Sequence, residues 1–145
     1  MRIHLAAVDP LRLRAMVAAL EAHPGLALAG TSDLAPAILQ TCVRTRVRVA
    51  VVLAGAVPVE VLHAVASLRA LGRRVETVAL VEDPPDPDRI QALLSAGARG
   101  ILSEKVGADE INRAVRAVAV GGCVLGPAAT DHVLARAGSA QQQFL

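Results

Sequence analysis

The chain has 145 residues, enough for one domain with a substantial hydrophobic core. Hydrophobic residues make up 54% and charged residues 19%, and no apolar run approaches the roughly 20 residues that span a bilayer, which argues against a membrane protein. A net charge of +2 with one aromatic residue gives no sign of a nucleic-acid-binding domain. The N-terminus has no signal-peptide pattern, so we expect a cytoplasmic protein.

Apolar strand-like runs alternate with helix-period segments along the whole chain. Asp9-Pro10, Thr31-Ser32-Asp33 and Asp86-Pro87 are typical helix starts, and Gly97 suits a left-handed helix end. We expect strands over residues 3–8, 26–30, 49–54, 75–81 and 100–102. We expect helices from residue 10 to about 22, from about 34 to 43, from 59 to about 71, and over 87–96, 108–120 and 127–136.

Five strands alternating with the first five of these helices predict a doubly wound α/β fold with helices on both faces of a parallel sheet. Right-handed crossovers favour the flavodoxin-like arrangement, a five-stranded sheet in the order 2-1-3-4-5. We predict one domain over residues 1–137. Residues 138–145 then form a glutamine-rich, linker-like tail.

The run from Val49 to Leu53 is continuously apolar and β-branched, which is typical of a strand buried on both faces. Binding and chemistry in such sheets occur just beyond the carboxyl ends of the central strands. That position is held by Ala54, which can neither ionise nor coordinate a metal.

Over about residues 1–135 the sequence resembles the receiver domain of NarL/FixJ-type bacterial response regulators. The resemblance is most specific in Ser95–Leu102, in Ala108–Ile111 and in Arg116–Gly122, which ends in paired glycines. Val8-Asp9-Pro10 is similar to the acidic end of the family's first strand. Pro58 is similar to the proline that follows its phosphorylation loop.

The residues at the family's active positions differ. The resemblance places Ala54 at the phosphoacceptor aspartate, Val81 at the hydroxyl residue, and Ile101 at the aromatic switch residue. Glu104 stands at the conserved lysine, with Lys105 one place later, and Asp9 alone remains of an acidic pair. Phosphoryl transfer needs a nucleophile, a Mg²⁺ held by several oxygens and donors for the phosphoryl group. We therefore expect no phosphorylation, no Mg²⁺ site and no enzymatic activity.

Other readings of these residues remain open. Asp9 is either an N-cap or a relic metal ligand, and with Glu82, Asp83 and Glu104 it forms either a solvated acidic rim or a displaced cation site. The vestigial pocket, comprising Asp9, Ala54, Val81, Glu82, Glu104 and Lys105, is apolar enough to suit a small organic ligand. Hydrolase and dinucleotide-binding motifs are absent.

We expect a homodimer or partner face with charges of both signs. It lies either on the fourth helix, fifth strand and fifth helix or on the first and fifth helices. Its expected residues are Arg12, Arg14, Arg89, Gln91, Ile101, Lys105, Asp109, Asn112, Arg113 and Arg116.

The cysteines and histidines show no metal-ligand spacing. We expect Cys42 and Cys123 to be small core residues. We expect the histidines at the surface or at helix ends: His4, His23, His63 and His132.

These observations predict a phosphorylation-independent receiver domain of a transcriptional regulator. It would control dimerisation, and through it DNA binding by a C-terminal helix-turn-helix domain beyond these residues. The alternatives are a stand-alone protein-interaction module and a small-ligand-sensing pseudo-receiver without DNA binding.

Overall fold

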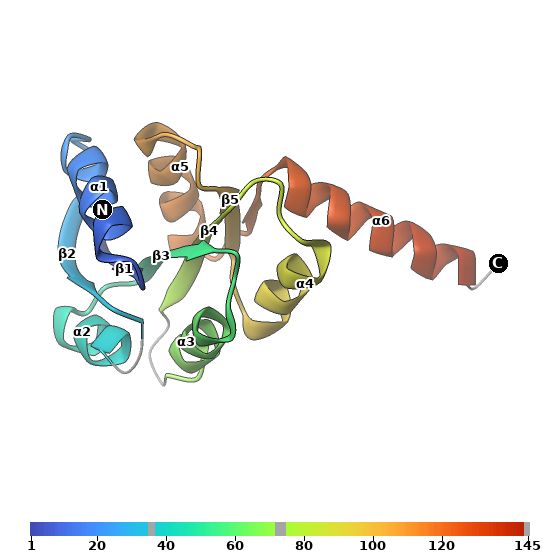
Figure 1. Cartoon of the computed structure of the whole chain (residues 1–145), viewed down its shortest axis with the longest axis horizontal. Helices are drawn as coiled ribbons and strands as arrows, with labels where there is room; N and C mark the ends of the chain where they lie inside the picture. Colours follow the sequence, from blue (N-terminus) through green and yellow to red (C-terminus); the bar gives the residue numbers. More distant parts are fainter. Residues whose placement is uncertain (35–36, 72–74, 144–145) are drawn as a thin grey trace.

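A computed structural model of the chain describes residues 1–34, 37–71 and 75–143 and shows a doubly wound α/β domain (Figure 1). The last two residues of the predicted tail therefore lie outside the described residues. All strand pairs are parallel, and the sheet has the order β2-β1-β3-β4-β5-β6. The predicted order of the first five strands is confirmed, and a sixth strand adds to the edge.

Strands and helices alternate from β1 to α6. The strands are β1 (Arg2–Ala7), β2 (Ala27–Ser32), β3 (Val49–Gly55), β4 (Glu76–Val81), β5 (Gly100–Ser103) and β6 (Val124–Leu125). The helices are α1 (Pro10–Glu21), α2 (Ala37–Thr45), α3 (Val59–Arg69), α4 (Pro87–Ala96), α5 (Ala108–Ala119) and α6 (Pro127–Gln143).

Two apolar clusters cover the two faces of the sheet. On one face the side chains of α1 and α5 pack against β1, β3 and β4, with Leu20, Ile111 and Val115 fully buried. On the other face α2, α3 and α4 contribute Ile38, Leu68 and Leu93. The predicted inward stripe of α5 is confirmed, because Ile111, Ala114, Val115 and Val118 are all buried.

Local signals place the helix ends. Asp9 and Asp86 accept hydrogen bonds from the backbone of Leu11 and Asp88, both at 2.9 Å, so both predicted N-caps are confirmed. Gly97 ends α4 at φ 112°, in the left-handed region that glycine adopts without a Cβ clash. Thr31 and Ser32, however, belong to β2 and do not cap a helix.

The chain after α5 differs most from the prediction. Val124 and Leu125 form a sixth strand that pairs with Gly100 and Ile101. The backbone amides of Val124 and Gly126 donate hydrogen bonds to the carbonyl groups of Arg99 and Ile101. The last helix does not stop near Arg136 but continues to Gln143. It extends away from the rest of the domain toward the right in Figure 1. Residues 138–143 are therefore helical where we expected an extended linker.

Two further expectations were wrong. His4 is fully buried, because β1 lies between β2 and β3 and His4 is on the same face of the sheet as Ala6, which packs with α2. Its Nε2 atom lies 2.7 Å from the hydroxyl of Ser32, while its Nδ1 atom has no partner within the described residues. Cys42 is buried as expected, but Cys123 is exposed in the connection between α5 and β6.

Candidate functional site at the carboxyl edge

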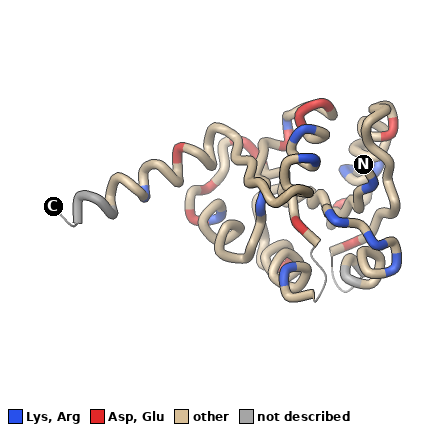
Figure 2. The backbone as a smooth tube through the Cα atoms, turned by 180° about the vertical axis from the view of Figure 1, so that it is seen from behind, with Lys and Arg blue, Asp and Glu red and all other residues tan. Residues whose placement is uncertain are grey.

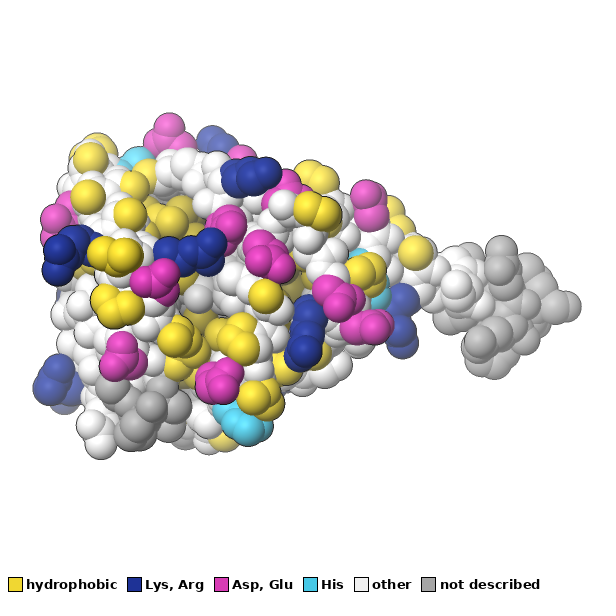
Figure 3. All heavy atoms as spheres, viewed as in Figure 1, with side chains coloured by type: hydrophobic (Ala, Val, Ile, Leu, Met, Phe, Trp, Pro, Cys, Tyr) yellow, Lys and Arg dark blue, Asp and Glu magenta, His cyan; other side chains and the backbone are white. Residues whose placement is uncertain are grey.

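The loops that follow β1, β3, β4 and β5 meet at the carboxyl edge of the sheet, which faces the viewer in Figures 1 and 3. In a doubly wound fold this edge is where ligands bind. The six residues of the predicted vestigial pocket all lie on these loops or strand ends. They do not, however, line one common cavity.

Ala54 lies at the carboxyl end of β3, and its surroundings are apolar. Its side chain is 3% exposed and packs in the same cluster as Val57 and Val81. The pairing of β3 with β4 shifts between Leu53 and Gly55, so that Ala54 forms a bulge in the ladder. The backbone then turns tightly, with the amide of Val57 donating to the carbonyl of Ala54 at 2.8 Å. No group at this position can attack or hold a phosphoryl group.

Arg12 and Glu104 form an ion pair across this edge. The Arg12 Nη1 atom lies 3.2 Å from Glu104 Oε2, which connects the first turn of α1 to the end of β5. The same nitrogen lies so close to Gly55 that a Cβ atom there would stand 3.3 Å from it. A guanidinium therefore lies over the end of β3, and the carboxylate of Glu104 is turned toward it. Lys105 is exposed.

The acidic residues at this edge are dispersed. Asp9 caps its own helix, Glu104 pairs with Arg12, and Glu82 and Asp83 are exposed on the β4–α4 loop. Within the residues that the structure describes, no group of three or more His, Cys, Asp or Glu side chains is placed to hold a metal ion.

Val81 and Glu82 instead line a cavity of about 200 Å³ between the β4–α4 loop, β5 and the start of α6. Its apolar lining includes Ile90, Ile101 and Ala129. Glu104 and Lys105 border a separate open groove of about 350 Å³ along α1, beside Met16 and Leu53. The predicted pocket is thus divided into two hollows, and Ala54 lines neither of them.

The predicted partner face is partly covered by the chain itself. Ile101 is 1% exposed and pairs with Leu125 of β6, so its assignment to a partner face was wrong. The side chain of Gln91 lies 3.0 Å from Nε2 of His132 in α6. The α4–β5 part of this face is therefore covered by β6 and α6, which pack against α4 and β5.

The α5 part of the predicted face contacts the turn between α1 and β2. His23 Nε2 lies 2.7 Å from Asp109 Oδ1, and Arg116 donates to the carbonyl oxygen of Gly25 at 3.2 Å. Asn112 accepts from Nε of Arg116 at 3.1 Å. The exposed members of the predicted face are Arg12, Arg14, Arg89, Lys105, Asp109, Arg113 and Arg116.

Sequence reasoning missed two features of this region. It did not foresee that Arg12, three residues after the Asp9 cap, forms an ion pair with Glu104 across the sheet edge. It also missed that Val124–Leu125 is a strand. The signal for that strand was a short apolar pair between Gly121-Gly122 and Gly126-Pro127.

The fold is that of response-regulator receiver domains. The isolated receiver domain of RcsB from Salmonella enterica serovar Typhimurium superposes with a TM-score of 0.75 at 14% identity, over 92% of this chain and 98% of that one. The receiver domain of the putative response regulator NarL from Mycobacterium tuberculosis gives 0.70 at 22% identity, over 83% and 96%. The response regulator ChrA of a heme-sensing two-component system gives 0.72 at 18% identity, over 93% and 64%. No protein-family model and no curated protein sequence matches the chain.

Within the described residues, no helix is both long and apolar enough to cross a bilayer.

Proposed function

We propose that this chain is a phosphorylation-independent receiver domain that regulates through assembly and not through phosphoryl chemistry. The observation that carries the proposal is the carboxyl edge: the apolar Ala54 stands where a receiver needs its nucleophile, and the Arg12–Glu104 ion pair lies beside it. The solved structures with a similar fold are response regulators, which favours a signalling role over an enzymatic one.

A metal ion is not part of this proposal. Mg²⁺ prefers several oxygen ligands at short distances. Of the carboxylates nearby, Asp9 accepts a hydrogen bond from the backbone amide of Leu11, and Glu104 forms an ion pair with Arg12. The guanidinium of Arg12 also adds a positive charge at the place where a cation would bind, and like charges at short range repel.

Incubation of the protein with a small phosphodonor and Mg²⁺, followed by intact-mass measurement, tests this part of the proposal. We expect the mass to stay unchanged. A stable adduct of one phosphoryl group, lost on treatment with hydroxylamine, would overturn it, because that lability is characteristic of an acyl phosphate.

The regulatory output that we propose is DNA binding by a helix-turn-helix domain that follows these residues. One neighbouring structure contains RcsB dimers bound to DNA, and this chain corresponds to 67% of that protein. The reading frame beyond residue 145 tests this part. A helix-turn-helix sequence there supports it, whereas an immediate stop codon would favour a stand-alone interaction module.

A small-ligand sensor is the second candidate, and the cavity beside Ile101 favours it. Its volume of about 200 Å³ is below the usual range for a drug-sized ligand, which begins at about 300 Å³, so only a small molecule fits. A thermal-shift screen of small organic molecules tests this candidate. Binding that the substitution Ala129→Leu abolishes would support it, and stabilisation that persists in this variant would place the ligand elsewhere.

A further inference from the structure

The two edges of the sheet carry opposite charge. Acidic side chains dominate the carboxyl edge, where Figure 3 shows mainly magenta among the charged groups. Basic segments gather on the opposite, amino edge, which Figure 2 shows from behind. Among the described residues, the arginines at the amino edge include Arg2, Arg44, Arg46, Arg48, Arg69 and Arg99, and the acidic residues there include Glu21 and Glu76.

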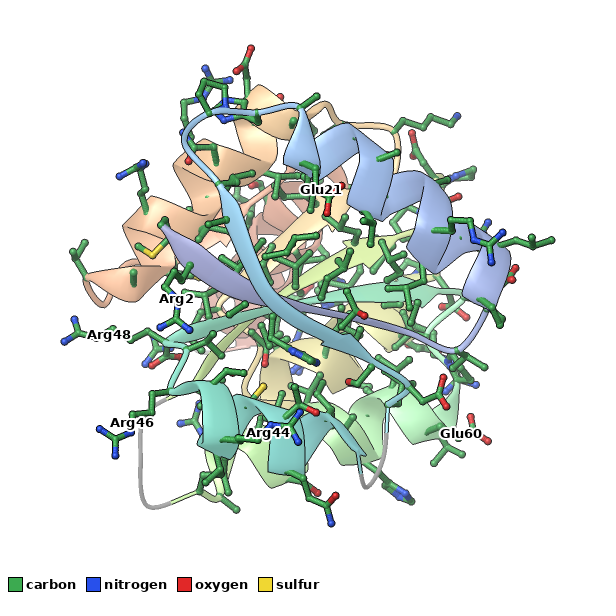
Figure 4. The ribbon with its side chains drawn as sticks, turned by 90° about the vertical axis from the view of Figure 1, so that its left-hand side faces the viewer. Arg2, Glu21, Arg44, Arg46, Arg48 and Glu60 are labelled. Carbon is green, nitrogen blue, oxygen red and sulfur yellow. The ribbon has the colours of Figure 1, made fainter. Side chains whose placement is uncertain are left out.

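Part of this segregation compensates helix dipoles. Glu60, Asp88 and Asp109 occupy first turns, and Arg44 and Arg69 occupy last turns. Helix dipoles do not account for the charged residues that lie outside helices. Arg2, Arg46 and Arg48 lie at or before the starts of β1 and β3, and none of them forms an ion pair with a described residue. Figure 4 shows these three side chains together at the left of the view, at the edge where β1 begins.

A groove accompanies the arginines. It has a volume of about 710 Å³ and lies between the α2–β3 turn, the start of β4 and the end of α5. Its lining includes Arg46, Arg48, Glu76 and Val120, the last of which is 87% exposed. The Oε2 atom of Glu76 lies 3.9 Å from the Nε atom of Arg99. The groove thus offers an apolar contact and two guanidinium groups that have no ion-pair partner among the described residues.

The opposite edge carries a segment of opposite charge. An acidic segment, formed by the β4–α4 loop and the first two residues of α4, reads Glu82-Asp83-Pro84-Pro85-Asp86-Pro87-Asp88, and all of these residues except Pro85 are exposed. None of its carboxylates forms an ion pair within the described part of the chain. Its three prolines restrict the backbone, which lowers the entropy lost on docking.

We infer that the acidic segment of one copy docks in the Arg46–Arg48 groove of a second copy. Arginine binds carboxylates through its planar fork of donors, so carboxylates are well suited to this groove. The acidic segment and the groove lie on opposite edges of the same domain, so the contact is heterologous and continues head to tail into a ring or a chain. This assembly goes beyond the proposed function, since it uses neither the α1–α5 face nor any phosphoryl group.

Nucleic acid is the less favoured occupant of the groove. Glu76 and the carbonyl end of α5, both part of the lining, place negative charge in the groove. Within the described part of the chain, the lining contains no aromatic side chain on which a base could stack.

The test is sedimentation velocity of the nucleic-acid-free protein over a range of concentrations. At about 10 mM salt, where the Debye length is about 30 Å, we expect the weight-average sedimentation coefficient to rise with concentration. At about 1 M salt, where that length is about 3 Å, the rise should disappear. A rise that persists in high salt, or no rise in low salt, would overturn the inference.

Two charge-reversed variants make the test specific. We expect Arg46→Glu/Arg48→Glu and Glu82→Lys/Asp88→Lys each to weaken self-association by about tenfold or more. Mixed in equal amounts, the two variants should associate again, because each then meets an edge of opposite charge. Restoration requires both variants to be folded, so misfolding cannot imitate it. Failure of the mixture to associate would overturn the proposal.

The matched control is Arg14→Glu/Arg113→Glu, which reverses two exposed charges on α1 and α5, away from the groove and the acidic segment. We expect it to associate like the unmodified chain. If only this control loses association, the contact belongs to the α1–α5 face and the inference fails. If the Arg46→Glu/Arg48→Glu variant loses binding to a mixed-sequence DNA duplex but self-association is unchanged, the groove is a phosphate site and the inference also fails.

Discussion

Buried His4 makes the stability of this domain depend on pH in a defined window. Its Nε2 atom lies 2.7 Å from Ser32 Oγ, and that hydroxyl donates its own hydrogen to the carbonyl of Asp33 at 2.7 Å. The oxygen of Ser32 therefore accepts from Nε2–H, and the unpartnered Nδ1 carries the lone pair. Protonation would place a second N–H in an apolar site without an acceptor. Burial accordingly lowers the pKa of His4 from 6.5 to about 4.

The sign of the effect follows from this direction. Between these two pKa values the unfolded chain binds a proton that the folded chain does not, so the free energy of unfolding falls as the pH falls. From about pH 7 to about pH 5, His4 alone should remove about 2 kcal/mol of stability. Replacing it with an uncharged residue removes this contribution and leaves that of every carboxylate in place.

The assay is urea unfolding of the unmodified chain and of His4→Leu at several pH values in that window. We expect the leucine variant to lose about 2 kcal/mol less than the unmodified chain over the window. His4→Gln, which packs differently but also cannot titrate, should show the same shallower dependence whatever its stability at neutral pH. If both variants parallel the unmodified chain, His4 does not titrate as the structure predicts and the reasoning is refuted.

Three further predictions follow from single sites. Ala54→Asp introduces a carboxylate without its partners, so we expect no phosphoryl adduct by intact mass. We also expect the free energy of unfolding, measured with urea, to be about 1–3 kcal/mol lower than that of Ala54→Ser. An adduct would contradict the account. A double-mutant cycle with Arg12→Ala and Glu104→Gln should give a coupling of only about 0.2–1 kcal/mol, because the Arg12 side chain is 51% exposed; a coupling near zero would show that the pair does not form in solution. Gly97→Ala should lower the free energy of unfolding by about 1–2 kcal/mol, because a φ of 112° is strained for a residue with a Cβ and Arg69 packs against this position. Gly107→Ala should lower it less, because the added Cβ meets open space.

The sequence predicted the sheet and the two helical layers because local and global signals agree there. The continuous apolar run of β3, the caps Asp9 and Asp86, and the stripe of α5 each have one structural meaning. The chain after Gly122 is different. Val124–Leu125 is too short to show a strand period, and the sequence of residues 138–143, with a glycine, a serine and three glutamines, does not indicate a helix.

The candidate site was predicted in composition but not in arrangement. Sequence position alone places Ala54, Val81 and Glu104 at strand ends, and the structure has them there. It could not reveal that Glu104 pairs with Arg12, or that Val81 and Ile101 share a cavity with α6, because these contacts join residues far apart in the chain. For the same reason the burial of His4 was missed, since a single histidine in a short strand has no partner visible in the sequence.

The most direct test of the central claim is sedimentation velocity at physiological salt, with and without Mg²⁺ and beryllofluoride, the phosphoryl mimic. A domain that has Ala54 at the nucleophile position and a guanidinium beside it should give the same distribution of species under both conditions at every concentration. A shift toward dimer that appears only with beryllofluoride and Mg²⁺ would show that the carboxyl edge still binds a phosphoryl group. That result would contradict phosphorylation-independent regulation.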